Sequence, residues 1–392
     1  MAGSEEAARP SGTPILDSGV LPPRSRKKSV VSFVPGLVGG FLFGLAMVAI
    51  GEKADGDLYP GEGLLIFVVA LGLSVTVHEF GHLLAGWALG FQFSFLSIGP
   101  FSLRLEYGLL KVRVRREMPV LGYAGMHVNG VKRLRRRMLV YIAAGPAANL
   151  ISVPVAVILT NHAFPSLMYS WTSSLAAEFV MISILLFALG LVPLGSSSDG
   201  SRIAMLLRSR ERARRWISTI AVGGQQRKGT RPKHWRQTWL RTATSLHDHS
   251  LDEFSGNWMA YISANAKKDT SLASLHLERC LELAHLLRHS TRDLVAQETA
   301  VFAAWFRKDA ALAEKWASQV KKPKLTQHVL RIRMNLALCC ARRDFAGASD
   351  IWQQGFTLIE KLPATLSRDR LRESWLEWQA EIQERRRETV IA

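Results

Sequence analysis

Hydrophobic residues gather in long runs in the first half of this chain. Four runs are long enough to cross a bilayer as helices, which takes about 20 apolar residues. They cover roughly residues 30–50, 63–90, 138–160 and 172–194. From about Asp252 onward the apolar positions follow helical periodicity instead. The pattern predicts a polytopic α-helical membrane protein with about four transmembrane helices, followed by an all-α, helical-repeat-like domain.

Polar and apolar residues alternate between the second and third runs, as they do in β-strands. The alternating stretches, separated by turn glycines, are Phe93–Ile98, Ser102–Tyr107 and Leu109–Arg115. We therefore expect a small β-hairpin insert, with the following segment Met118–Ala124 dipping back toward the helices. Such a sheet either docks an extended substrate by strand addition or is a plain membrane-surface hairpin, and the pattern favours neither.

Three short motifs recur in the second half. They begin at Asp269, Asp309 and Asp344, which are 40 and 35 residues apart, and each has an Ala four residues after the Asp. Each is typical of the start of the second helix in a helix–turn–helix pair. The spacing resembles that of tetratricopeptide repeats, whose period is about 34 residues, and a generic helical bundle is the alternative. Either arrangement offers a groove to a protein partner rather than a catalytic centre.

Charge adds a prediction of topology. The 392-residue chain is 48% hydrophobic and has a net charge of +18. Basic residues are concentrated before the first run and in segment 91–137, whereas segment 52–62 is acidic and segment 161–171 has no Lys or Arg. Because cytoplasmic loops of membrane proteins are enriched in Lys and Arg, both termini and segment 91–137 are predicted to be cytoplasmic. The basic charge is then a topology signal, which weakens the case for nucleic acid as a partner.

These patterns divide the chain into four parts. In chain order they are a disordered basic tail, a membrane domain, a basic juxtamembrane linker and the helical domain, over residues 1–28, 29–208, 209–250 and 251–392. A signal peptide is the competing interpretation of the first run, which is longer and begins later than a typical signal. The linker carries Trp216, Trp235 and Trp239 among its arginines, which suits anionic lipid headgroups. The three cysteines lack paired spacing, so we expect them to pack as small hydrophobic side chains.

The second apolar run contains a dense polar cluster. His78, Glu79 and His82 lie in the middle of the apolar stretch Leu71–Gly90. Histidines four residues apart share one face of a helix and supply two ligands of a tetrahedral zinc shell. Glu79 can then take a proton from a zinc-bound water, as in the HExxH motif of metalloproteases. The alternative, two histidines satisfied inside a core, is disfavoured because hydrocarbon offers no water to an unpaired Glu or His.

A third ligand is predicted after the last apolar run. Pro193 and Gly195 should break the helix and leave a turn that carries Asp199. A carboxylate would complete a three-residue zinc site and leave the fourth position open for water. Considered by itself, Asp199 before Gly200 would be interpreted as a solvent-exposed turn residue, and the other motifs favour its interpretation as a ligand.

Together these motifs resemble the site-2 protease family of intramembrane zinc metalloproteases. The resemblance covers roughly residues 30–208. Its three motifs are His78-Glu-Phe-Gly-His82, Gly145-Pro-Ala-Ala-Asn149 in the third run, and Asp199-Gly200. Their order along the chain, at suitable depths in the apolar runs, makes the resemblance specific.

The resemblance implies a zinc endopeptidase with Glu79 as catalytic base and one Zn²⁺ per chain, bound by His78, His82 and Asp199. It implies that Gly145 and Pro146 pack beside the site and that Asn149 lies near the metal or the substrate backbone. The implied substrate is a transmembrane protein cleaved in regulated intramembrane proteolysis, for example an anti-sigma factor. The implied location is a bacterial plasma membrane.

The chain departs from the family pattern at one position. The family usually has an Asn three residues before the proline of the last motif, where this chain has Gly190. If that Asn helps to hold the substrate, its role is vacant here or has moved, with Asn149 as the candidate. All metal ligands and the base are retained, so we expect activity. The alternative is a non-catalytic membrane scaffold with a structural or vestigial metal site, whose function resides in the helical repeats.

Overall fold

The computed structural model describes residues 14–23, 60–106, 109–114, 122–160, 171–195, 198–320, 328–363 and 365–391. The predicted apolar span at 30–50 lies outside these residues. The chain forms two compact units: one is Arg26–Arg227, and the other combines Met1–Ser25 with Lys228–Ala392. The boundary after Arg227 differs from the predicted one after residue 208.

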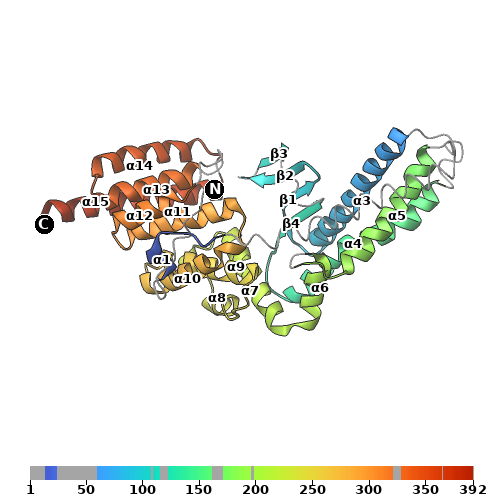
Figure 1. Cartoon of the computed structure of the whole chain (residues 1–392), viewed down its shortest axis with the longest axis horizontal. Coiled ribbons are helices and arrows are strands. Elements are labelled where there is room, and N and C mark those ends of the chain that lie inside the picture. The colour runs from blue at the N-terminus through green and yellow to red at the C-terminus, as the bar shows by residue number, and fades with distance from the viewer. Residues whose placement is uncertain are drawn as a thin grey trace, which may run out of the picture. The chain divides into compact units, whose positions relative to one another are not determined.

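Three long helices form the frame of the first unit, and each corresponds to a predicted apolar run. They are α3 (Pro60–Ala88), α4 (Leu134–Ile158) and α5 (Trp171–Leu191), and all three contact one another (Figure 1). Each is long and apolar enough to cross a membrane. Their outward side chains include Leu65 and Ile151, which are 63% and 65% exposed. Apolar surface on this scale is rare on a water-soluble monomer, and the described part of the chain thus contains three helices that are long and apolar enough to cross a membrane.

A four-stranded antiparallel sheet connects α3 to α4. Its strands are β1 (Gln92–Ile98), β2 (Phe101–Glu106), β3 (Leu109–Val114) and β4 (Gly122–His127), in the order β3-β2-β1-β4. The first three match the predicted strands, and β4 extends the predicted hairpin into a larger sheet. β4 was missed because its Gly-Tyr-Ala-Gly sequence has low strand propensity. Gly125 is needed there because a Cβ at this position would lie 2.2 Å from a ring carbon of Phe95.

Much of segment 209–250, which was predicted to be a basic juxtamembrane linker, is helical. α6 (Asp199–Arg208) and α7 (Arg210–Arg227) follow α5, and α7 belongs to the first unit. α7 buries Ala213 and Val222 on one face and also encloses Arg215, which is 1% exposed. Trp235, expected at the lipid surface, is 2% exposed and donates its indole N–H to the Thr230 carbonyl. The frequent arginines concealed the helical periodicity of these buried positions.

The second unit is built from helical hairpins. Within this unit, short elements at Pro232–His234 and Gln237–Ala243 (α8) precede the hairpins. The pairs are α9 (Leu251–Ala266) with α10 (Thr270–Glu282), α11 (His289–Trp305) with α12 (Ala310–Ser318), and α13 (His328–Ala341) with α14 (Phe345–Glu360). A 3₁₀ turn, Leu283–Leu286, follows α10, and the long helix α15 (Leu366–Ile391) packs on α14.

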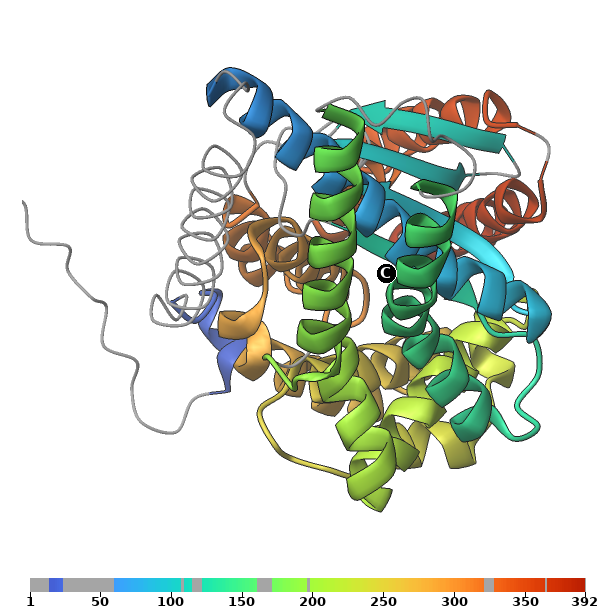
Figure 2. The same cartoon turned by 90° about the vertical axis from the view of Figure 1, so that its right-hand side faces the viewer.

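Figure 2 shows the α4 and α5 helices of the first unit, in green, side by side.

The three recurring Asp motifs begin the second helix of each hairpin, as predicted. Asp269, Asp309 and Asp344 each cap their helix by accepting a hydrogen bond from the backbone N–H three residues later. The Ala four residues after each Asp is 0–1% exposed, which confirms its packing position. A basic residue in the left-handed backbone region precedes each Asp, with φ between 56° and 62°. The Lys/Arg-Lys/Arg-Asp pattern therefore marks these turns more sharply than the Asp alone.

Part of the predicted disordered tail is ordered. Residues Ile15–Ser18 form a helical turn, α1, in the second unit, and Leu16 in this turn is 1% exposed. The high content of Ala, Ser, Gly, Pro and charge in residues 1–28 suggested disorder, but a binding surface elsewhere in the chain supplies the burial that the tail itself lacks. The cysteines behave as predicted: all three are free, and Cys280 and Cys340 are buried.

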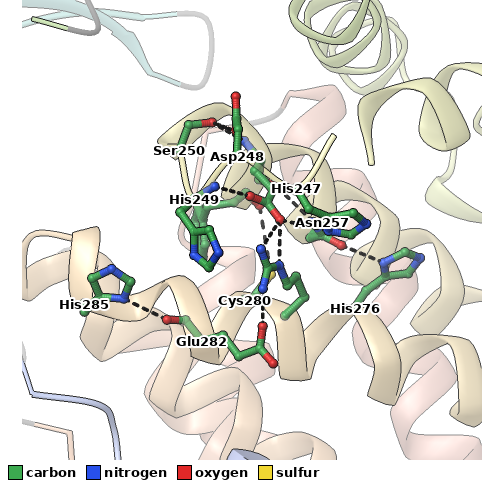
Figure 3. A network of polar contacts seen from close by, with 12 residues as sticks. His247, Asp248, His249, Ser250, Asn257, His276, Cys280, Glu282 and His285 are labelled. Atoms are coloured by element: carbon green, nitrogen blue, oxygen red, sulfur yellow. Dashed lines mark hydrogen bonds and ion pairs between the residues drawn. The ribbon is translucent and has the colours of Figure 1, made fainter. Parts of the chain in front are cut away.

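A buried carboxylate secures the start of α9 to α10 (Figure 3). The Glu253 side chain is fully buried and accepts hydrogen bonds from the Arg279 guanidinium and from the backbone N–H of His249. Ser250 caps the same helix by accepting from the Glu253 N–H. Burial raises the pKa of Glu253, but the Arg279 and His249 hydrogen bonds outweigh it, so the pKa is lowered from 4.5.

We expect Glu253→Gln to lower the free energy of unfolding of the helical unit by about 2 kcal/mol, because the fully buried Glu253 carboxylate loses its charged hydrogen bonds with Arg279 and the His249 N–H, and Arg279 keeps only its pair with Glu282. Eight of the 11 Trp residues lie at or after position 235, so tryptophan fluorescence of the full chain during denaturation reports on this unit. Glu314→Gln is the control, since its pair with Arg342 is exposed and contributes less than about 1 kcal/mol. The Glu253 contribution is complete above pH 4.5 and is lost as the pH falls through the lower folded pKa. Equal stability of the two variants would contradict the prediction.

Candidate metal centre

Helix α3 places the two predicted histidine ligands one above the other. The rings of His78 and His82 are 5.0 Å apart and nearly perpendicular. Both side chains point toward α4, because a Cβ on Gly145 would lie 2.3 Å from His82 Nε2 and 2.8 Å from His78 Nε2. The Nε2 atoms of both histidines thus converge on one point, as the HExxH spacing predicts.

Asp199 meets both histidines although it is 121 residues away from His78 in sequence. Its Oδ2 atom lies 3.0 Å from His78 Nε2 and 3.3 Å from His82 Nε2. Burial raises the pKa of Asp199, but hydrogen bonds from the two histidines outweigh it and lower the pKa to about 2. The carboxylate is therefore ionised at neutral pH, the form that binds a cation.

The backbone that follows α5 places the Asp199 carboxylate beside the two histidines. Gly195 has φ +71°, which reverses the chain where α5 has ended. Ser198 caps α6 by accepting from the Ser201 N–H, so that Asp199 occupies the first turn of α6, where negative charge is favoured. Gly200 allows α6 to pack on the end of α5, since a Cβ there would lie 2.4 Å from the Val192 carbonyl oxygen. Asp199 thus supplies a candidate ligand, and the adjacent Gly200 permits the close contact between α6 and the end of α5.

A hydrogen bond to a backbone carbonyl fixes the orientation of the His82 ring. Its Nδ1 atom lies 2.8 Å from the backbone carbonyl oxygen of Tyr141 on α4. A carbonyl only accepts, so His82 donates the proton on its Nδ1 atom to Tyr141, and its Nε2 atom faces His78 and Asp199. Hydrogen bonds of this kind to the outer nitrogen set the tautomer of metal-binding histidines. Sequence reasoning missed this contact because it comes from a main-chain atom.

Strand β4 closes the site beside the predicted base. Glu79 is 5% exposed and accepts a hydrogen bond from the Ala124 backbone N–H, while the Ala124 carbonyl accepts from the Tyr141 hydroxyl at 2.9 Å. Gly122 permits this approach, because a Cβ there would lie 2.4 Å from Glu79 Oε1. Glu79 Oε2 has no hydrogen-bond partner among the described residues. The described end of segment 118–124 therefore lies against α3, as expected, and β4 is an unpredicted part of the site.

The Gly145–Asn149 motif lies beside the histidines, but its members differ in what they contact. Gly145 supplies the space for both imidazoles, and Pro146 contacts α5, where a Cβ on Gly190 would lie 2.9 Å from Pro146 Cγ and 3.6 Å from His78 Cε1. Position 190 thus faces the site, and Gly there keeps α4 and α5 close. Asn149 is fully buried one helical turn from Gly145, and neither atom of its amide has a partner in the described structure.

These residues fit a metal ion. The ligand atoms of His78, His82 and Asp199 lie within 4.8 Å of one another. Two imidazoles and a carboxylate match the ligand set of catalytic zinc sites, in which a fourth position stays open. His78, His82 and Asp199 could therefore hold a metal ion together.

Comparison of the chain with protein-family models, with curated proteins and with solved structures finds no match. The functional interpretation therefore rests on the motifs and on the geometry of this site.

Proposed function

We propose that the protein is an intramembrane zinc endopeptidase that cleaves membrane-spanning proteins. The observation that carries the proposal is the meeting of His78, His82 and Asp199 at one point, with the Glu79 carboxylate on the adjacent position of the same apolar helix. A buried acid with one oxygen free is the group that a hydrolytic reaction at this point requires.

Each residue of the chain then has a distinct role. His78, His82 and Asp199 would hold Zn²⁺, which when bound polarises a carbonyl and lowers the pKa of water to about 7. Glu79 takes a proton from the attacking water and passes it to the departing amine. The Tyr141 carbonyl keeps His82 in the tautomer that binds metal. The Ala124 N–H orients the Glu79 carboxylate so that one of its oxygens is available for the proton.

The position of the site supports access of water from the cytoplasm. The Asp199 side chain is 26% exposed and follows the end of α5, which the distribution of Lys and Arg assigns to the cytoplasmic side. A helical substrate conceals its backbone, so it must unwind locally before it reaches Glu79. Strand β4 lies at the edge of the sheet and beside Glu79, which favours docking of the unwound segment as an added strand.

The other parts of the chain provide attachment. Arg208, Arg210 and Arg214 are exposed on α6 and α7, immediately after the last apolar helix, and suit anionic lipid headgroups. The helical hairpins of the second unit suit recruitment of a protein partner or regulation by one.

Metal removal tests the proposal. We expect purified protein to hold about one zinc per chain and to cleave a reporter with a transmembrane helix; dialysis against 1,10-phenanthroline should abolish cleavage, and added Zn²⁺ should restore it. Asp199→Asn should lower the zinc content, whereas Asp252→Asn, at the start of α9 in the other unit, should leave it unchanged. Purified protein that holds far less than one zinc per chain and does not cleave the reporter would favour the scaffold alternative, and cleavage that resists chelation would exclude the zinc mechanism.

A further inference from the structure

The N-terminal segment Pro14–Pro22 lies on the second unit in the manner of a bound peptide. Every third residue of it is buried: Leu16, Gly19 and Pro22. Leu16 enters the hydrophobic core of the unit, and Ile15 and Leu21 pack against the same core. The segment is more than 260 residues away in sequence from the residues of α10 that it contacts.

The surface that holds the segment recognises its backbone. Glu278 on α10 accepts hydrogen bonds from two successive backbone N–H groups, those of Ile15 at 2.5 Å and Leu16 at 2.7 Å. Trp316 on α12 is fully buried and donates its indole N–H to the Leu16 carbonyl at 2.9 Å. The start and the middle of the turn are thus fixed by groups from two different helices.

Two arginines extend the recognition along the segment. Arg307 pairs with the Asp17 carboxylate, and Arg292 donates to the Pro22 carbonyl at 2.6 Å. Gly19 has φ +70°, and a Cβ there would lie 2.8 Å from the Cβ of Lys315. The surface thus selects an apolar residue, an acidic residue and a glycine at fixed spacing.

We propose that this face of α10, α11 and α12 is a peptide-binding site whose resident ligand is the chain's own N-terminal segment. Its ligand class is a short peptide with the pattern Ile-Leu-Asp-Ser-Gly, and the segment exchanges with such peptides. Directed hydrogen bonds to a ligand backbone, together with one buried apolar anchor, are typical of peptide recognition. If the segment were absent, Glu278 and the buried Trp316 N–H would lose these partners, which makes an occupied site more favourable than an empty one.

The site has a consequence for the architecture. The first unit is covalently continuous with the second at Arg227–Lys228, and the docked segment, which belongs to the second unit, precedes the first unit in the chain. The helical unit is thus attached to both ends of the first unit, once covalently and once through this site. A partner protein that carries the same pattern would compete with a tethered ligand and release the second attachment.

The test uses the full chain with a specific protease sequence inserted between residues 23 and 24 and an affinity tag at the N-terminus. After cleavage, we expect the tagged segment to retain the rest of the chain, and an excess of a synthetic peptide of residues 12–23 to displace it. Leu16→Asp should weaken retention at least tenfold, because it places a charge in the core. Val20→Asp, at a position that is 48% exposed, should retain the segment as the wild type does.

Variants on the other side of the contact separate binding from folding. Glu278→Gln keeps the side-chain shape and removes one acceptor oxygen, whereas Trp316→Phe removes the indole donor together with one ring; each should weaken retention by about tenfold. Glu314→Gln on α12, whose partner is Arg342, should have no effect. Tryptophan fluorescence verifies that the helical unit of each variant is folded. Immediate loss of the cleaved wild-type segment, or a segment that the peptide does not displace, would overturn the proposal.

Discussion

Replacing Glu79 by Gln should stop proteolysis while zinc stays bound. Gln has nearly the same shape and can still accept the Ala124 N–H through its carbonyl oxygen, but it cannot take a proton at neutral pH. General base catalysis contributes about 10²–10⁴-fold to enzymatic rates, so we expect at least a hundredfold slower cleavage. Zinc content should stay at that of the wild type, because Glu79 is not one of the three converging ligands.

The measurement compares wild type and Glu79→Gln in membranes, with quantitative detection of new protein termini. Substrates of the wild type should accumulate uncut with the variant and co-purify with it. Glu62→Gln, in the first turn of the same helix, is the matched control and should cleave normally. Undiminished cleavage by Glu79→Gln would exclude the proposed mechanism, and loss of zinc from this variant would show that Glu79 has a structural role.

The candidate metal centre was the most predictable part of this chain, because its first two candidate ligands follow from local geometry. His78 and His82 need only a helix to lie on one face, and the apolar run around them makes that helix evident. The role of Asp199 was harder to predict, since an aspartate before a glycine is common in turns. In the structure, Gly200 and Ser198 position α6 so that its first residue, Asp199, reaches the histidines.

What sequence reasoning missed depends on contacts that no local pattern encodes. The Tyr141 carbonyl behind His82 is a main-chain atom, so residue identity gives no indication of it. Strand β4 contains glycines because Glu79 and Phe95 approach its backbone closely, and the same glycines conceal it from a propensity-based prediction. The glycines Gly122 and Gly125, three residues apart on either side of Tyr123 and Ala124, were the available signal.

The helical unit contains one feature that the sequence predicted correctly and one that it did not. The three Asp motifs predicted hairpin starts correctly, because an Asp cap and a buried Ala four residues later are local features. The N-terminal segment was interpreted as disordered because its composition cannot form a core of its own. Its order comes from Glu278 and Trp316, which lie far along the chain, and composition does not report such a partner.

Gly145→Ala should nearly eliminate zinc binding. The added Cβ would lie 2.3 Å from His82 Nε2 and 2.8 Å from His78 Nε2, well inside van der Waals contact. Both imidazoles must then move, and metal affinity depends on ligand positions within about 0.2 Å. Removing the support of a metal ligand costs 10–100-fold in affinity; since this change displaces two ligands directly, we expect a loss of at least about a hundredfold.

Two further glycines provide a graded control. A Cβ on Gly72 of α3 meets nothing within 4 Å, so Gly72→Ala should bind zinc like the wild type, with a slightly more stable helix. A Cβ on Gly190 would lie 2.9 Å from Pro146 Cγ and 3.6 Å from His78 Cε1, so Gly190→Ala should fall between the other two. Zinc affinity is measured by competition with a chelator of known affinity, and circular dichroism verifies that helix content is retained. The expected order of affinity is Gly72→Ala, then Gly190→Ala, then Gly145→Ala. Wild-type affinity in Gly145→Ala would mean that the histidines do not bind metal in the positions that this glycine leaves open.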